Sequence, residues 1–369
     1  MNMLIVILVL AFLVLIHELG HYLAARFIGI RVREFGFGYP PRALKLGTWK
    51  KTLFSLNWLP FGGFVRLAGD DAESLEGAGE KDEDGSVIPK QELFAEKPPV
   101  KRLVVVLAGV VVNIVFGIAA FAILYTMFGI PENLPHPLIE IVAQGSPAET
   151  AQLKSGDEIL LLNNQEVNSA QAFITMLRQF RGEIVTIEVK RDGEVLKLEP
   201  YVRTPEETPT DEGGLGVMLN DVKIVQYPPW QMIPKGIARG VQDSYAFAKQ
   251  ILSSLGQLVV TLVQKRSVPN ELSGPIGIVY VAQKQDVFKQ GPFMVLNFAG
   301  LLSLNLGVLN LLPIPALDGG RAVFILLERL LGKERRVRYE QRANAVGMIF
   351  LLGLIVLISV KDVLMIVRK

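Results

Sequence analysis

The chain has 369 residues, of which 50% are hydrophobic and 20% are charged, so it is richer in apolar side chains than an ordinary soluble domain. At about 150 residues per domain, this length predicts two to three domains. The formal net charge of +2 provides no global basic field, which excludes nucleic-acid binding as a main function. Because the chain has no cysteine, disulfides, thiol nucleophiles and thiolate metal sites are excluded, and a bound metal needs His, Asp or Glu ligands.

Four apolar stretches are long enough to cross a membrane, since a helical span needs about 20 apolar residues. They predict transmembrane helices at about 3–27, 103–129, 291–312 and 343–365. A cleaved signal peptide is the alternative for the first stretch. No Lys or Arg precedes that stretch, and the later spans make a leader unnecessary.

Basic residues near the span ends predict the orientation, because positively charged loops stay in the cytoplasm. One basic group extends from Arg26 to Lys51 after the first span, and another extends from Arg321 to Arg342 after the third. Both loops are therefore expected on the cytoplasmic side, with the termini and the segment between Pro131 and Gly291 outside.

The region 221–290 is predicted to contain an amphipathic helix. Apolar residues recur from Ile233 to Leu262, with charged residues such as Lys235 and Arg239 between them. These charges favour a helix at the membrane interface rather than a fifth span. A crossing helix would also place the two basic loops on opposite sides.

The first span contains a pattern that indicates a metal site. His17 and His21 lie four residues apart, so they share one helix face and can bind the same ion. Glu18 is placed to contact a metal-bound water. Each ionisable residue at mid-bilayer depth costs roughly 2.5 to 3.5 kcal/mol, so three of them within a turn and a half indicate function rather than histidines that are merely hydrogen-bonded in a bundle. The third histidine, His136, is interpreted as a turn residue outside the membrane.

A catalytic zinc usually has three protein ligands and one open position, so a third ligand is needed. Glu34 is a candidate, although it lies in the basic loop. Asp318 is the better candidate, because Pro313 and Pro315 break the helix before it and opened backbone at membrane depth needs a cavity or surrounding protein. A solvent-exposed Asp in a turn is the alternative. His17 and Asp318 both lie toward the cytoplasmic end of inward-running spans, as a shared ion requires.

The segment 131–220 resembles a PDZ domain in the order of its elements. Strands are predicted at 139–142 and after Gly156, a helix at 170–180, and a hairpin around Asp192-Gly193. Such domains add an extended peptide to a sheet edge, so a substrate tail or a freshly cut C-terminus is an expected ligand. A steric gate that excludes substrates with large outer domains is the alternative.

The cytoplasmic region 31–69 is predicted to contain a membrane-associated β-hairpin. Residues 52–67 have two β-rich halves joined by Pro60, Gly62 and Gly63. Since an open sheet edge cannot face lipid, this hairpin must pack against the helices or at the interface, where its edge can hold an unwound substrate. The stretch 70–98, mixed in charge, is predicted to be a mobile loop.

Together these motifs resemble the site-2 proteases, the zinc intramembrane metalloproteases of peptidase family M50, and in particular the bacterial branch typified by the regulator of sigma-E protease. Besides residues 17–21, the similar segments in the expected order are 61–66, Ala108-Gly109 with Asn113, 272–277, 305–307 and 310–319. The resemblance implies that His17, His21 and Asp318 bind Zn²⁺, that Glu18 is the catalytic base, and that Asn305 and Asn310 line the substrate cleft. Substrate contacts are also expected from Gly62, Gly63 and Phe64. The best-known members carry two PDZ domains, whereas this chain has room for one.

The expected fold is a polytopic α-helical membrane protein with four transmembrane helices, a membrane-associated β-hairpin and one extracytoplasmic PDZ domain. By resemblance, the expected activity is zinc-dependent cleavage of transmembrane segments in regulated intramembrane proteolysis. The substrates would be single-span proteins, such as anti-sigma factors after a first cleavage, or remnant signal peptides. The expected location is the bacterial cytoplasmic membrane, in contact with lipid and with the active site toward the cytoplasm. A non-catalytic PDZ scaffold and a metal transporter are the alternatives.

Overall fold

A computed structural model of the protein describes residues 2–70, 82, 85–209, 212–265, 277, 280 and 291–367. The chain divides into two compact units. The helical unit comprises Met1–Leu124 and Ile233–Lys369, and the β-unit comprises Tyr125–Met232. The β-unit is thus longer at both ends than the predicted domain at 131–220.

Among the described residues, four helices are long and apolar enough to cross a membrane, in agreement with the four predicted spans. They are α1 (Asn2–Ile28), α2 (Pro99–Phe128), α7 (Pro292–Leu311) and α9 (Lys333–Val367). Helix α9 begins ten residues before the predicted span, because the charged residues 333–342 are mostly good helix formers and continue the helix beyond its apolar part.

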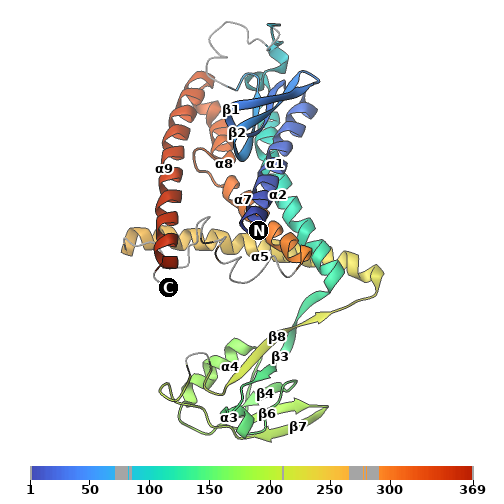
Figure 1. Ribbon diagram of the computed structural model, residues 1–369, viewed down its shortest axis with the longest axis vertical. Coiled ribbons are helices and arrows are strands. Elements are labelled where there is room, and N and C mark those ends of the chain that lie inside the picture. Colours follow the sequence, from blue (N-terminus) through green and yellow to red (C-terminus); the bar gives the residue numbers. More distant parts are fainter. Residues whose placement is uncertain are drawn as a thin grey trace. The chain divides into compact units, whose positions relative to one another are not determined.

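Helix α5 (Pro229–Lys265) occupies much of the region predicted to hold an amphipathic helix, and it runs across the direction of α1 and α9 (Figure 1). It is not among the helices apolar enough to span. A Cβ added at Gly240 would lie 2.9 Å from the backbone nitrogen of Ala122, so α5 contacts the backbone of α2 where only glycine fits. Residues 266–276, which include most of the matching segment 272–277, lie outside the described residues, as do residues 278, 279 and 281–290 of the predicted region.

A non-helical segment, residues 312–317, separates α7 from α8 (Asp318–Leu331). It contains the two prolines that predict a break there. The N–H of Ala316 donates to Asn344 Oδ1 of α9 at 2.9 Å. An added Cβ at Gly319 or Gly320 would lie 2.2 Å from a backbone oxygen of the preceding chain, so both positions require glycine. Asp318 therefore begins a helix at a tight corner.

The helical unit also contains a sheet formed by β1 (Val32–Trp49) and β2 (Thr52–Leu67). The predicted pairing within 52–67 is wrong, because this stretch is one bent strand that pairs with β1. The turn lies at Lys50 and Lys51, whose φ angles of 48° and 67° suit a tight hairpin turn. Both strands fold back, so residues 34–37 have partners in both 53–56 and 63–66.

Part of the sheet packs on α1, where Tyr22 contacts the rings of Phe35 and Phe54. Elsewhere the sheet exposes large apolar side chains, which are Leu44, Leu46, Trp49, Leu56, Trp58 and Leu59. Exposed apolar surface of this kind suits a lipid or interfacial environment.

The stretch predicted as a mobile loop, 70–98, is partly packed. Its residues 71–81, 83 and 84 lie outside the described residues. From Ile88 onward it forms two short 3₁₀ turns and buries Ile88, Phe94 and Ala95. The N–H of Phe94 donates to the carbonyl of Ala68 at 2.7 Å. The charges dominate this sequence, but two large apolar side chains hold its second half against the helical unit.

The β-unit contains a sheet with the strand order β7-β6-β4-β3-β8, and β5 pairs with β4. Its strands are β3 (Ile130–Val142), β4 (Glu158–Leu162), β5 (Gln165–Glu166), β6 (Ile187–Arg191), β7 (Glu194–Leu198) and β8 (Val217–Val225). The helices are α3 (Pro147–Thr150) and α4 (Ala170–Leu177). Its core includes Ile139, Ile159, Leu162, Phe173, Ile187 and Val189.

His136 lies in strand β3, so its interpretation as a turn residue is wrong. Its Nδ1 donates to the carbonyl of Val167 at 2.8 Å. The register of β3 against β8 shifts between Asn133 and Leu138. Pro135 and Pro137 have no N–H for the ladder, so the sheet accommodates them at this irregularity instead of ending there.

Candidate metal centre

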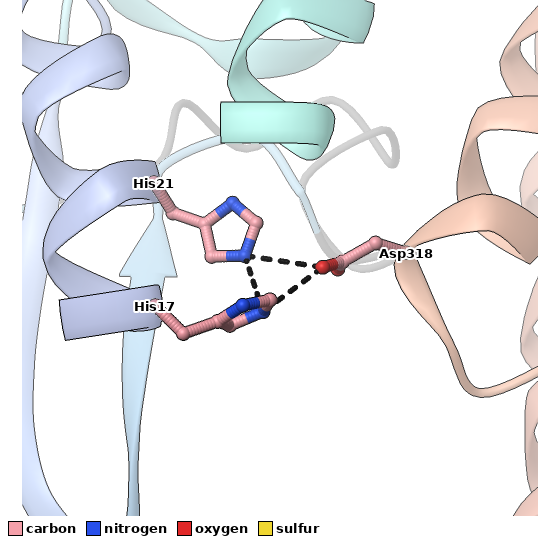
Figure 2. Close-up of side chains that lie close together, drawn as sticks. All are labelled: His17, His21 and Asp318. Carbon is pink, nitrogen blue, oxygen red and sulfur yellow. Dashed lines mark hydrogen bonds and ion pairs between the residues drawn. The ribbon is translucent and has the colours of Figure 1, made fainter. Parts of the chain in front are cut away.

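Side chains from α1 and α8 converge at one point although they lie about three hundred residues apart in the chain (Figure 2). Asp318 Oδ2 is 3.0 Å from His17 Nε2 and 3.4 Å from His21 Nε2. The two Nε2 atoms are 3.2 Å apart. Helix α1 presents both imidazoles on one face, and the corner at the start of α8 presents the carboxylate.

These three atoms fit a zinc ion. Asp318 Oδ2 is buried and accepts no hydrogen bond in the described structure. Zinc–ligand bonds of about 2.0–2.1 Å in a tetrahedron place the ligand atoms about 3.3 Å apart, which matches the observed separations. Three nitrogen and oxygen ligands also leave the fourth position that catalysis requires.

Helices α1 and α2 approach closely beside this group because each has a glycine at the contact. A Cβ added at Gly20 would lie 2.7 Å from the carbonyl oxygen of Ala108. One added at Gly109 would lie 2.5 Å from His21 Nε2 and 2.8 Å from His17 Nε2. Small residues at helix contacts allow such backbone approach in membrane proteins. Helix α2 therefore forms one wall of the candidate centre.

Polar groups of α2 face the Nδ1 atoms of both imidazoles. His21 Nδ1 donates to the carbonyl of Val105 at 2.8 Å. The side-chain amide of Asn113, which is fully buried, lies 3.2 Å from His17 Nδ1. Ser303 Oγ of α7 donates to the carbonyl of Asn113 at 2.8 Å. The imidazoles are thus fixed from the side opposite to their converging Nε2 atoms.

Glu18 lies beside the converging atoms and close to the sheet. It is near enough to His17, His21 and Asp318 to interact with all three electrostatically. A Cβ added at Gly63 of β2 would lie 3.3 Å from Glu18 Cγ. Glu18 therefore lies near the group of candidate ligands and packs against the backbone of β2.

Comparison with known protein families matches residues 5–354 to a family described as peptidase family M50. The chain belongs to this family. The resemblance visible in the sequence is thus confirmed, and the protein is a peptidase.

Similar relatives extend over almost the whole chain. A protein of Clostridium perfringens, provisionally named as a zinc metalloprotease, is 31% identical and covers 95% of both chains. One of Fusobacterium nucleatum with the same provisional description is 32% identical and covers 98% of both. The zinc metalloprotease RasP of Geobacillus kaustophilus is 28% identical over 97% of this chain and 96% of its own.

Among solved structures, the PDZ domain of an SdrC-like protein from Listeria monocytogenes aligns with 24% of this chain and 93% of its own. The sequence identity is 22% and the TM-score is 0.21.

The remaining residues predicted to contact substrate lie on two elements. Asn305 and Asn310 are half-buried in the second half of α7. Gly62, with a φ of 81°, lies at the bend of β2. Gly63 and Phe64 follow it and pair with β1. Among these residues, Gly63 lies in close contact with the side chain of Glu18.

Glu34, the other candidate for the third ligand, is engaged elsewhere, and Asp318 completes the group instead. Glu34 Oε2 accepts from Arg42 Nη2 at 2.7 Å, and Oε1 accepts from Ser55 Oγ at 2.6 Å. Burial alone raises the pKa of Glu34, but these hydrogen bonds hold it below its ordinary value. Within the described residues, Glu34 is thus not part of the group of candidate ligands.

An ion-pair network behind Asp318 was not predicted. Arg102 of α2 is 1% exposed, and its guanidinium donates to both oxygens of Glu328 of α8 at 2.7 and 2.6 Å. Arg321, one turn after Asp318, donates to Asp70 at 2.5 Å. The sequence near Arg102 does not indicate its ion pair with Glu328. Its burial depends on α8, which the local sequence does not reveal.

Proposed function

We propose that the protein is a zinc-dependent intramembrane endopeptidase whose metal is bound by His17, His21 and Asp318 and whose general base is Glu18. The observation that carries this proposal is the convergence of three ligand atoms within 3.4 Å, one of them a buried oxygen without a hydrogen bond. Membership of a peptidase family and the names of the relatives support hydrolysis and zinc.

The two alternatives are less favoured. A transporter needs successive ligand sites across the membrane, whereas the described residues contain one group of three candidate ligands. A scaffold with a dead site needs a missing catalytic group, yet His17, Glu18, His21 and Asp318 are all present.

The residues of the centre have separate roles in peptide hydrolysis. When bound, zinc polarises the scissile carbonyl and lowers the pKa of water toward about 7. Glu18 accepts the proton of the attacking water and passes it to the leaving amine. Asn305 and Asn310 hold the substrate backbone or the developing oxyanion.

The edge of β2 offers a way to present the substrate. A transmembrane helix hides its peptide bonds in internal hydrogen bonds, so it must unwind before attack. Within the described residues, 63–66 pair with β1 on one side only, and Gly63 lies against Glu18. An unwound segment added to this edge as a strand, in contact with Gly62, Gly63 and Phe64, would pass next to the base.

The proposed substrates are transmembrane segments of single-span proteins, such as anti-sigma factors after a first cleavage or remnant signal peptides. The proposed location is the bacterial cytoplasmic membrane, with the centre toward the cytoplasm and the β-unit outside. Four apolar helices, the distribution of basic residues and the bacterial relatives support this assignment.

The test uses the full chain purified in detergent, a single-span reporter substrate and zinc analysis. Glu18→Gln is expected to lose roughly 10²- to 10⁴-fold in cleavage rate while it retains zinc, because it removes the base and no ligand. Asp318→Asn is expected to lose zinc. Glu96→Gln, a change of an exposed carboxylate, is the matched control and is expected to behave as wild type. Wild-type turnover by Glu18→Gln would refute the assignment.

The β-unit is proposed to be a PDZ domain that binds peptide C-termini. A groove of about 380 Å³ lies between one face of α4 and strand β8. Its lining includes Phe173, Ile174, Leu177, Val217 and Leu219. Strand β8 is at the end of the sheet, so an extended peptide can add to it. Residues 213–215 also line the groove, and their backbone N–H groups are proposed to bind the terminal carboxylate of the peptide.

Peptide binding to the full chain distinguishes this proposal from a steric gate. A peptide with an apolar C-terminal residue is expected to bind, and its C-terminally amidated form is expected to bind at least tenfold more weakly. Ile174→Glu in the groove is expected to abolish binding, whereas Val195→Glu on β7, at the other end of the sheet, is the control. A gate predicts no difference among these peptides and variants.

A further inference from the structure

Three residues of α2 spaced one turn apart face the candidate metal centre. They are Val105, Gly109 and Asn113, and the first and last contact the Nδ1 atoms of His21 and His17. Gly109 leaves space beside both Nε2 atoms. Residues at i, i+4 and i+8 share a helix face, so α2 is arranged to fix both imidazoles from behind.

The convergence of the Nε2 atoms determines where each imidazole carries its proton. A neutral imidazole has one N–H, and the ring nitrogen that binds a metal must carry no proton. Both Nε2 atoms point at Asp318 Oδ2, so both rings must carry the proton on Nδ1 when a metal is bound. For His21 this requirement is met, because Nδ1 donates to the carbonyl of Val105 at 2.8 Å.

For His17 the acceptor must come from Asn113. The amide nitrogen of Asn113 lies 3.2 Å from His17 Nδ1, which would place two donors against each other in the metal-bound state. Asn113 Oδ1 is buried and has no hydrogen-bond partner in the described structure. Rotation of the Asn113 side-chain amide by 180° exchanges its oxygen and nitrogen within the same volume. In that orientation Oδ1 of Asn113 accepts from Nδ1–H of His17.

We propose that Asn113 is a positioning residue for the metal: its Oδ1 accepts from His17 Nδ1–H and thereby leaves Nε2 bare to bind zinc. This inference rests on the proposed zinc function. Ser303 supports it indirectly, because its hydroxyl holds the backbone carbonyl of Asn113 and so connects α7 to the same turn of α2. Partners of this kind behind a ligand histidine contribute about 10- to 100-fold to metal affinity.

The opposite orientation of the amide makes a contrary prediction. If the nitrogen of Asn113 donates to His17 Nδ1, the proton of that ring lies on Nε2, and the ring faces Asp318 with an N–H. An aspartate at position 113 distinguishes the two cases, since a carboxylate accepts from Nδ1–H but cannot donate to a bare Nδ1.

The experiment measures the zinc dissociation constant of the full chain in detergent by chelator competition, together with the thermal midpoint of the zinc-free protein. Asn113→Leu is expected to weaken zinc binding 10- to 100-fold, while Asn113→Asp stays within threefold of wild type or binds more tightly. Val111→Leu, at an exposed position of the same helix, is the matched control and is expected to stay within threefold.

Three results would overturn the proposal: wild-type affinity in Asn113→Leu, a tenfold loss in Asn113→Asp, or a loss in Val111→Leu equal to that in Asn113→Leu. If Asn113→Leu does not fold, ¹⁵N-histidine spectra of the wild-type zinc complex decide, because the proposal requires a proton on Nδ1 of His17. Failure of the wild type to bind zinc would refute the proposed function itself, so the two failures are distinguishable.

Discussion

Replacement of Gly109 by alanine tests whether the wall formed by α2 sets the geometry of the metal centre. The new Cβ would lie 2.5 Å from His21 Nε2, which is 0.9 Å closer than the 3.4 Å at which ordinary contact begins. It would also lie 2.8 Å from His17 Nε2. The methyl group therefore presses on the two nitrogen atoms that are proposed to bind zinc.

The size of the effect follows from the cost of overpacking. An extra methyl group in a well-packed site costs typically about 1–3 kcal/mol. The imidazoles of His17 and His21 can rotate away from the methyl only if they leave the metal, so this cost falls on the zinc-bound state. At tenfold per 1.4 kcal/mol, zinc affinity is expected to fall roughly 5- to 150-fold.

The assay is chelator competition on the purified chain, with Gly353→Ala as a matched control. Gly353 is also a helical glycine, in α9, and a Cβ there would meet nothing within 4 Å. The control is expected to bind zinc as wild type does and to gain about 0.5–1 kcal/mol in stability from the better helix former. Wild-type zinc affinity in Gly109→Ala would show that α2 does not confine the ligands and would refute this reasoning.

Two further predictions concern the buried ion pair between α2 and α8. Glu328→Leu is expected to destabilise the protein by about 3–5 kcal/mol, because it leaves the guanidinium of Arg102 buried without its carboxylate. Arg102→Met is expected to cost less, because Glu328 keeps its ion pair with Arg336 at 3.2 Å, and the double variant is expected to cost less than Glu328→Leu. Thermal unfolding of all four forms in detergent measures this, and purely additive losses would contradict it. Burial raises the pKa of Glu328, but the hydrogen bonds from Arg102 hold this pKa below its ordinary value of 4.5. The ion pair therefore contributes its full stabilisation above pH 4.5, and this stabilisation is lost as the pH falls through the lowered pKa of Glu328. The double variant is expected to lose less stability in acid than the wild type does. Equal losses would contradict this prediction.

Local patterns were sufficient to locate the converging residues of the centre. The spacing of His17 and His21 requires only a helix, and the break before Asp318 requires only the chemistry of proline. The four apolar helices were predicted for the same reason, since the length of an apolar run is itself a local property. The roles of these residues in catalysis stay predictions.

Features that depend on distant partners were missed or mispredicted. The sequence of residues 52–67 is equally compatible with two strands that pair with each other and with one strand that pairs with β1, and the structure has the second arrangement. Phe94 is buried in a cluster with residues of the helices and the sheet, although Glu92, Glu96 and Lys97 lie close to it in the sequence. Asn113 is an ordinary polar residue in an apolar helix until α1 places His17 beside it. Each depends on contacts between elements, which side-chain periodicity does not specify.

The corner that carries Asp318 has a consequence for ion selectivity. Gly319 and Gly320 pack against backbone oxygens, so the carboxylate is delivered by a rigid backbone and cannot withdraw to admit a larger ion. Calcium, with metal–oxygen distances of about 2.3–2.6 Å, would need the three ligand atoms roughly half an ångström further apart. We therefore expect the centre to disfavour divalent cations larger than zinc, and we expect this preference to depend on two residues that have no side chains.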